Sequence, residues 1–246
     1  MTPATPREGR PRFAQTVLAD LIDRIASGEF SPGSALPAEP DLLAEYGVSR
    51  GVAREAVKLL ESRGIARTHH GRGTRVTAYD DWNLLDPLVL SACTRYDIDQ
   101  QIQSELATLR ASLEPGLAAS AAQVATAADV AVLDAYLDAM RRTVDLPDEF
   151  LDIDFQFHGA IMTIARSRLI RQLVHTVHTH IRDEESLSFT SADELRSTLK
   201  EHVTIRDAIA SGDADRARDT MRRHITDAWV RRSSSMKPRP SHHTAT

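Results

Sequence analysis

The chain has 246 residues, of which 41% are hydrophobic and 26% charged, enough for one large or two small domains that each bury a core. No stretch approaches the roughly 18 uncharged apolar residues of a membrane-spanning helix. The N-terminus also lacks the apolar core of a signal peptide. We therefore expect a soluble, cytoplasmic protein with no membrane partner. Cys93 is the only cysteine, which excludes an internal disulfide and a cysteine-based zinc finger.

The net charge of −5 argues, over the whole chain, against nucleic-acid binding, because affinity for phosphate comes from Lys and Arg. The charge is unevenly distributed, however. Residues 1–78 carry 11 basic and 9 acidic side chains, residues 79–230 carry 15 and 26, and residues 231–246 carry 4 and none. This asymmetry predicts a first domain over 1–78, a linker and connecting segment over 79–100, a second domain over 101–230, and a disordered basic tail over 231–246.

In the first segment, apolar residues with helical spacing predict helices over residues 13–29, 39–46 and 50–63. Gly47 interrupts the pattern between the second and third helices, and Ser49 is suited to cap the third with its hydroxyl. Two short strands, over 65–68 and 74–76, flank a tight turn that contains Gly71 and Gly73.

The third predicted helix carries a basic stripe, because Arg50, Arg54 and Lys58 recur every four residues. In a helix-turn-helix the second helix enters the major groove, where Arg50 and Arg54 would reach base edges and Lys58 a phosphate. On an isolated helix, such a stripe is more often a solvated face. The basic, Gly-rich hairpin that follows favours a winged helix-turn-helix, because glycine lets the backbone approach the sugar-phosphate surface.

Residues 13–77 resemble the winged helix-turn-helix of GntR-family bacterial transcription regulators. The resemblance rests on four motifs: residues 33–39, residues 48–56, residues 60–65 and residues 71–76. It implies that Arg50 and Arg54 read bases and that His70 and Gly71 form the wing tip at the minor groove. Pro40 departs from the many relatives that have a basic residue there, which bears on the preferred operator. The predicted DNA-binding residues are Ser49, Arg50, Arg54, Lys58, His70, Gly71 and Arg72.

The second segment shows apolar runs of helical spacing and no alternating strand pattern, which predicts an all-α bundle of six or seven helices. The fold class is therefore mainly α, with one small β-hairpin wing in the N-terminal domain. Breakers at Pro115 with Gly116, at Pro147 and at Gly212 separate the helices. The expected helices cover residues 102–114, 116–123, 127–144, 148–165, 167–183, 192–210 and 213–230.

The histidines of the second segment are candidate metal ligands. Asp154 and His158 are four residues apart and leave one face of a helix, as two ligands of one ion require. His202 and His224 follow on later helices. Three imidazoles and one carboxylate suit Zn²⁺ or a similar divalent ion better than Ca²⁺ or Mg²⁺. An Asp–His pair at this spacing occurs by chance on a helix surface more often than it binds a metal. Sequence spacing also does not show that His202 and His224 lie near this pair.

Residues 154–158, 201–217 and 221–224 resemble the FCD effector domain of the FadR subfamily. This resemblance implies that Asp154, His158, His202 and His224 hold a divalent metal, zinc foremost with nickel or manganese as alternatives. It also implies that an effector's carboxylate binds at the metal with help from a basic residue on the first bundle helix. Arg110 is the candidate for that residue, although a solvent-facing Arg110 is equally consistent with the sequence. Residues 82–87 are similar to relatives that control sugar-acid use.

Three functions compete on this sequence. The first is a metabolite-responsive repressor, no enzyme, that binds a palindromic double-stranded DNA operator as a homodimer and responds to a small carboxylate or sugar acid. The second is a metalloenzyme that uses the three-His, one-Asp site. Against it, no convincing general base accompanies the ligands, and the basic wing would be unexplained. The third is a DNA-binding protein with a purely structural metal.

Overall fold

The computed structural model describes residues 9–96, 102–185 and 191–235, without the side chains of residues 9–11, 177–185, 232, 234 and 235. The chain divides into two compact units, residues 1–99 and residues 100–246. The described residues confirm the mainly α fold class, with one antiparallel hairpin in the first unit. Among them, no helix is both long and apolar enough to cross a membrane.

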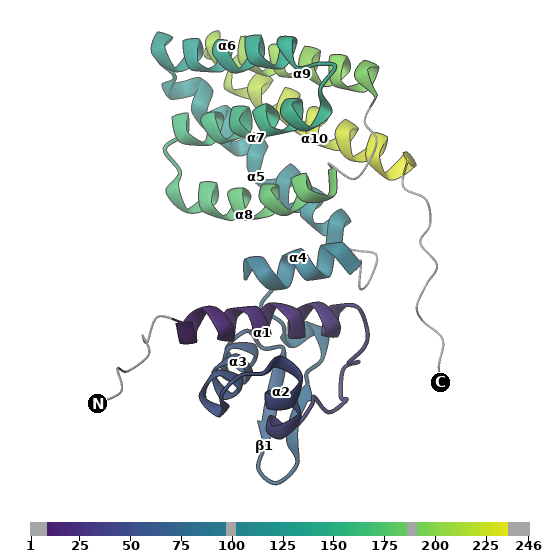
Figure 1. The fold of residues 1–246 in the computed structure, drawn as a ribbon. Helices are drawn as coiled ribbons and strands as arrows, with labels where there is room; N and C mark the ends of the chain where they lie inside the picture. Colours follow the sequence, from purple (N-terminus) through teal and green to yellow (C-terminus); the bar gives the residue numbers. More distant parts are fainter. Residues whose placement is uncertain (1–8, 97–101, 186–190, 236–246) are drawn as a thin grey trace, which may run out of the picture. The chain divides into compact units, whose positions relative to one another are not determined.

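The first unit contains the predicted helix-turn-helix and wing (Figure 1). Helix α1 packs against α3 and α4, and α2 packs against α3. Leu18, Leu21, Leu60 and Ile65 are fully buried in this core. The elements in chain order are α1 (Gly9–Ala26), α2 (Glu39–Tyr46), α3 (Arg50–Ser62), β1 (Ala66–His69), β2 (Gly73–Val76), the 3-10 helix η1 (Tyr79–Asp81) and α4 (Pro87–Tyr96).

The turn between α2 and α3 depends on Gly47, whose φ of 62° ends α2 in the left-handed conformation. Ser49 occupies the N-cap position of α3, as predicted, but its side chain makes no capping hydrogen bond. The prediction that the Ser49 hydroxyl caps α3 is therefore wrong, and the side chain is exposed. In the wing, β1 pairs with β2, and an isolated bridge joins Ala35 to Arg75 of β2.

The segment after the wing is more ordered than the linker that the sequence suggested, because it contains η1 and α4. Asp86 accepts hydrogen bonds from the backbone N–H groups of Leu88 and Val89 and so caps α4. The far end of α4 is tied to α1, since Arg95 and Tyr96 both contact the carboxylate of Asp23. Short capping signals and buried apolar contacts therefore make a helix in this stretch.

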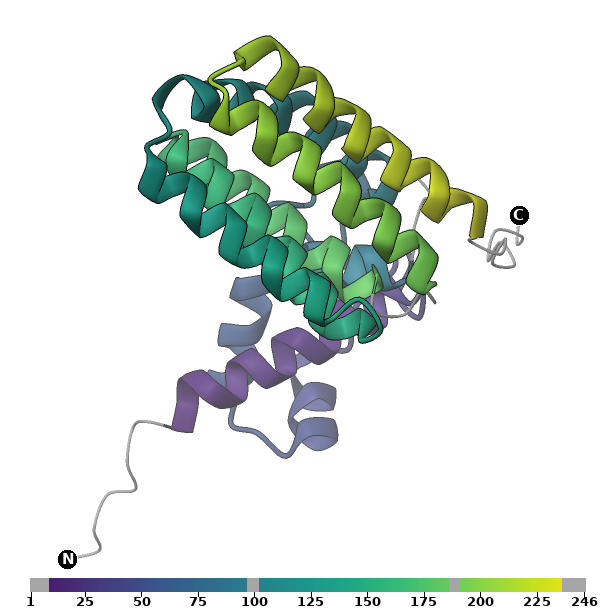
Figure 2. The ribbon, with the colours of Figure 1, turned by 90° about the horizontal axis from the view of Figure 1, so that it is seen from above.

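The second unit is a bundle of six helices among the described residues (Figures 1 and 2). Helix α5 runs through it and packs on α10, α7, α8 and α9, while α9 lies beside α10. Leu133, Leu137, Met140, Phe150 and Phe157 are fully buried in its core. The helices are α5 (Ile102–Val124), α6 (Ala127–Arg142), α7 (Pro147–Ile164), α8 (Arg168–Glu185), α9 (Ala192–Ala210) and α10 (Ala214–Ser235).

Two expected boundaries in this unit are wrong. Helix α5 continues through Pro115, which lies inside it, because buried residues on both sides of the proline pack against the bundle. Packing of this kind offsets the backbone hydrogen bond that proline removes. Helix α10 extends to Ser235, five residues into the expected tail, where Arg231 contacts α9. Residues 236–246 of that predicted tail lie outside the described residues.

We predict that Gly64→Ala destabilises the first unit strongly. Gly64 follows α3 with a φ of +74°, and an added Cβ would lie 2.0 Å from the backbone oxygen of Asp81. The backbone strain alone costs about 1–2 kcal/mol, and the clash displaces the segment that contains η1. Gly28→Ala is the control, because Gly28 has a φ of +88° and open space around its Cβ position. Equal losses of unfolding free energy in urea titrations of the two variants would contradict the clash.

Candidate metal centre and nucleic-acid interface

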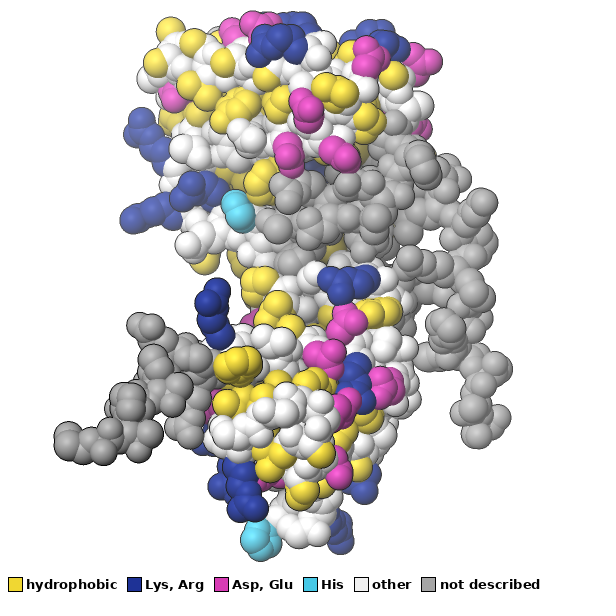
Figure 3. All heavy atoms as spheres, in the orientation of Figure 1, with side chains coloured by type: hydrophobic (Ala, Val, Ile, Leu, Met, Phe, Trp, Pro, Cys, Tyr) yellow, Lys and Arg dark blue, Asp and Glu magenta, His cyan; other side chains and the backbone are white. Residues whose placement is uncertain are grey.

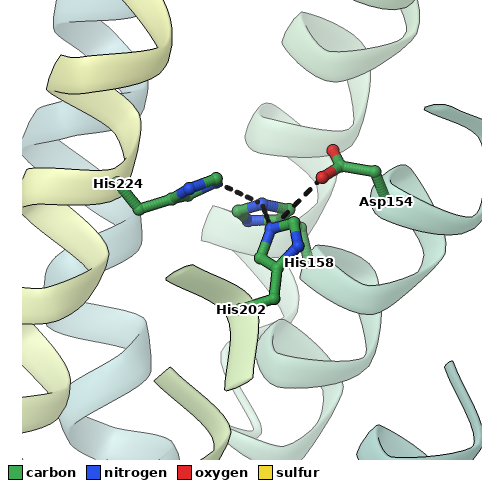
Figure 4. A group of neighbouring side chains, drawn as sticks. All are labelled: Asp154, His158, His202 and His224. Atoms are coloured by element: carbon green, nitrogen blue, oxygen red, sulfur yellow. Dashed lines mark hydrogen bonds and ion pairs between the residues drawn. The ribbon is translucent and has the colours of Figure 1, made fainter. Parts of the chain in front are cut away.

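Four side chains predicted from the sequence meet in the second unit (Figure 4). Asp154 and His158 project from one face of α7, His202 comes from α9 and His224 from α10. The three imidazoles are buried, and the Asp154 side chain is 17% exposed. Three different helices therefore have to pack correctly before the cluster exists.

The distances within the cluster match what one metal ion requires. Nε2 of His158 lies 3.2 Å from Nε2 of His224 and 3.3 Å from Nε2 of His202. Nε2 of His202 lies 3.2 Å from Oδ1 of Asp154. Zinc binds imidazole nitrogen at about 2.0–2.1 Å, so two nitrogens on one tetrahedral ion lie about 3.3 Å apart. The cluster of four residues could hold a metal ion, since its ligand atoms all lie within 4.8 Å of one another.

Two carboxylates set the orientation of two of these imidazoles. Nδ1 of His158 lies 2.7 Å from Oε2 of Glu114, and Nδ1 of His224 lies 2.7 Å from Oε2 of Glu201. A carboxylate accepts a hydrogen bond from Nδ1–H, and in that neutral tautomer Nε2 carries no proton and has a free lone pair. The bare Nε2 atoms of His158 and His224 then face each other across 3.2 Å. Two lone pairs at that distance repel unless a cation lies between them, so the donor set fits a metal.

Electrostatics also favour the neutral form of His202 and His224, and the neutral imidazole is the form that binds metal. Burial and the neighbouring rings of His224 and His158 lower the pKa of His202 well below its ordinary value of 6.5. Burial also lowers the pKa of His224, although the hydrogen bond to Glu201 opposes this. Burial would raise the pKa of Glu201, but hydrogen bonds from His224 and Arg231 outweigh it and lower that pKa.

Arg110 lies inside the bundle on α5, with 8% of its surface exposed, so the solvent-facing alternative is wrong. Its Nε donates to Oε1 of Glu114 at 2.6 Å. Arg110, Glu114 and His158 thus form one buried chain of contacts that ends at the cluster. Sequence reasoning missed Glu114 and Glu201, although Glu114 stands four residues after Arg110 and Glu201 directly precedes His202.

In the first unit, the predicted DNA-binding side chains are exposed on α3 and at the wing tip. Figure 3 shows Lys and Arg side chains and a histidine at the end of this unit that carries the hairpin. The Arg50 and Arg54 side chains are 80% and 67% exposed. Nε of Arg54 donates to Oε2 of Glu39 at 2.7 Å, a contact from the start of α2 that the sequence analysis did not foresee. Ser49, Lys58, His70, Gly71 and Arg72 are also exposed.

Comparison with known proteins agrees with both units. The family described as bacterial regulatory proteins, gntR family, matches residues 13–76, and the FCD domain family matches residues 105–227. The galactonate operon transcriptional repressor of Escherichia coli K12 is 30% identical over 157 residues, 64% of this chain and 69% of that protein. The uncharacterized HTH-type regulator YieP of the same organism is 32% identical over 166 residues, 66% of this chain and 72% of that protein. The chain belongs to the GntR family, in its FadR-type branch.

Solved structures show the same fold for this GntR-family protein. A Streptococcus agalactiae GntR structure has a TM-score of 0.50 at 26% identity and covers 89% of this chain and 99% of its own. The structure of Lar, which controls the expression of the Listeria monocytogenes agr system, has a TM-score of 0.60 at 20% identity and covers 95% of this chain and 99% of its own. With its gntR and FCD domains, the protein is a DNA-binding transcription regulator and not an enzyme.

The lowered histidine pKa values predict that acid destabilises the metal-free regulator. As the pH falls below 6.5, His202 and His224 take up protons in the unfolded chain before they do so in the folded one. The free energy of unfolding should therefore fall by at most about 1.4 kcal/mol per pH unit for each histidine.

Urea titrations of chelator-treated protein between pH 7.5 and 5.5 measure this slope. The control is the double variant His202→Asn with His224→Asn, which lacks both titrating groups and should show a shallower pH dependence. If the two proteins lose stability with equal slopes, the buried imidazoles do not cause the acid sensitivity.

Proposed function

We propose that this GntR-family regulator is a metabolite-responsive repressor whose effector binds at a divalent metal. The observation that carries the proposal is the convergence of three buried imidazoles and one carboxylate in the FCD domain. Zinc is the foremost candidate, because imidazole nitrogen with one carboxylate suits it and the nitrogen separations of 3.2 and 3.3 Å fit tetrahedral coordination. Nickel and manganese are the alternatives.

Four residues would hold the ion: Asp154, His158, His202 and His224. The bound metal would supply a Lewis-acidic centre for a carboxylate ligand. Arg110 would contribute positive charge near it, since its proximity helps to lower the pKa of His202. Residues 79–230 carry 15 basic and 26 acidic side chains, and this net negative charge disfavours the approach of anions at long range. A buried cation and Arg110 would offset that repulsion inside the site.

The chemical class of the effector is a small carboxylate or sugar acid. The galactonate operon transcriptional repressor, at 30% identity, supports the sugar-acid alternative for this chain. Effector binding alters DNA binding only if the DNA-competent and DNA-incompetent arrangements bind the effector with different affinity. A purely structural metal, without an effector, is the competing function that the experiment below separates from this one.

DNA recognition would use a dimer on a palindromic operator. One recognition helix reads few base pairs, and two-fold symmetry doubles the contacts. Arg50 and Arg54 near the start of α3 would read bases, Ser49 and Lys58 would lie beside them, and His70, Gly71 and Arg72 would bring the wing to the DNA backbone and minor groove. Exposure of all these residues on one unit supports the assignment.

We predict that Arg54→Ala costs about 1–3 kcal/mol of operator binding and relaxes base preference, because it removes a side chain that bonds a base edge. The operator is first selected by the wild-type protein from a pool of randomised duplexes and then titrated at fixed salt. Arg141→Ala is the control, because Arg141 is an exposed arginine on α6 of the other unit and changes the net charge equally. Operator affinity that matches the control would show that Arg54 does not read bases.

We predict that a small carboxylate or sugar acid raises the melting temperature only when metal is bound. At 100 times its Kd, a ligand adds about 2.7 kcal/mol of stability, which for a chain of this size is a shift of roughly 5–10 °C. The measurement is a thermal-shift screen of sugar acids and small carboxylates against zinc-loaded and chelator-treated protein.

The double variant His202→Ala with His224→Ala is the negative control. It should retain no zinc in elemental analysis, and its melting temperature should not change when the carboxylate is added. His175→Ala is the matched control, because His175 is an exposed histidine on α8. Full zinc occupancy in the double variant would show that the ligands are wrong. Zinc binding without any carboxylate shift would favour the structural metal.

A further inference from the structure

Arg231 lies near His224 and outside the part of the chain that matches the FCD domain family. Arg231 lies on α10, four residues beyond the end of the FCD match at residue 227. It is seven residues after His224, so both side chains leave the same face of the helix, two turns apart. The sequence placed Arg231 at the start of a disordered tail, whereas the structure places it against α9.

The contacts of Arg231 lead directly to the metal cluster. Nη1 donates to Oε1 of Glu201 at 2.9 Å, and Nη2 donates to Oε2 of Glu201 at 3.2 Å. Nη2 also lies 3.5 Å from Oγ1 of Thr198. Oε2 of Glu201 accepts from Nδ1 of His224 at 2.7 Å. A two-point guanidinium contact fixes a carboxylate in orientation as well as in position.

We propose that Arg231 is a positioning residue of the metal site, holding the Glu201 carboxylate that in turn orients His224. The proposal rests on the metal site of the proposed function and extends it to the C-terminal end of α10. A carboxylate on Nδ1–H fixes the tautomer and the ring of a ligating histidine, and such outer partners change metal affinity by about 10- to 100-fold. Without Arg231, Glu201 regains rotamer freedom that metal binding then has to remove.

The bundle contains a second chain of the same kind, which supports the interpretation. Arg110 contacts Glu114, and Glu114 contacts His158, in the same order of guanidinium, carboxylate and imidazole. Arg110 is 8% exposed, whereas the Arg231 side chain is 28% exposed. The chain through Arg231 is therefore the one that reaches the surface, at the last turns of the final helix.

Coupling through these contacts works in both directions. If Arg231 tightens metal binding, then metal binding must stabilise the contacts of Arg231 by the same free energy. Metal loading should consequently order the last two turns of α10. A residue with a merely structural role would stabilise this helix end equally with and without metal.

The first test is the zinc dissociation constant of the full-length protein, measured by competition with a chromophoric chelator. We expect Arg231→Met to weaken zinc binding about 10-fold, at the lower end of the range for outer partners because Arg231 acts through Glu201. Methionine keeps much of the apolar stem. The matched control is Arg222→Met on the same helix, since Arg222 is exposed and pairs with Asp219 at i, i+3. The control should bind zinc like the wild type.

The second test is amide hydrogen exchange of α10 with and without zinc. In the wild type, zinc should slow exchange in the last two turns, and in Arg231→Met this slowing should shrink. If Arg231→Met loses helix content in circular dichroism, Arg231→Lys is tested in its place. Lysine keeps the positive charge but cannot make the two-point contact with the Glu201 carboxylate. Arg231→Lys should therefore bind zinc with an affinity between those of the wild type and Arg231→Met.

The outcomes separate the two proposals. Wild-type protein that binds none of zinc, nickel and manganese overturns the metal site of the proposed function and the role of Arg231 with it. Wild-type protein that binds zinc, with Arg231→Met indistinguishable from Arg222→Met in affinity and exchange, overturns the role of Arg231 alone.

Discussion

Three imidazole rings in the interior of a helical bundle impose the main physical constraint on this molecule. Their Nε2 atoms approach one another at 3.2 and 3.3 Å, and two of the rings have their Nδ1 atoms committed to carboxylates. Neutral nitrogens in this arrangement have lone pairs that face each other in a region of low dielectric. The arrangement is unfavourable without a cation and becomes favourable around one. The donor set of the second unit thus fits a metal ion, as proposed above.

That constraint explains the polar groups that surround the site. Burying a carboxylate costs several kcal/mol unless it is paired and hydrogen-bonded. Glu114 is buried with Arg110 beside it, and Glu201 is held by Arg231, so each carboxylate has a guanidinium on one side and an imidazole on the other. The pairing lets α5, α9 and α10 pack closely while they carry charge. The histidine cluster, the packing of these helices and the end of α10 are therefore parts of one network.

In the first unit, the predicted functional side chains lie on the surface and not in the interior. Its basic side chains stand on the surface of α3 and the wing, where water screens them and where DNA can replace the water. Residues 1–78 carry 11 basic and 9 acidic side chains, so we expect operator affinity to depend on the placement of individual arginines more than on bulk charge. Glu39, at the start of α2, pairs with Arg54 on α3 and so restricts the conformations of the Arg54 side chain, which fits this interpretation.

Local patterns determined much of this protein from the sequence alone. The helical spacing of apolar residues, the glycines around the turn and wing, and the four-residue step from Asp154 to His158 depend only on near neighbours in the chain. The family motifs added the regulator function. Where the sequence reasoning was wrong, at Pro115, in α4 and at the end of α10, weak local preferences were outweighed by packing or by a distant partner such as Glu201. The family resemblance implied that His202 and His224 join Asp154 and His158, and the tertiary structure brings them together. Only the tertiary structure decided that Glu114, Glu201 and Arg231 surround them, because those contacts join residues on different helices and no spacing rule relates one helix to another.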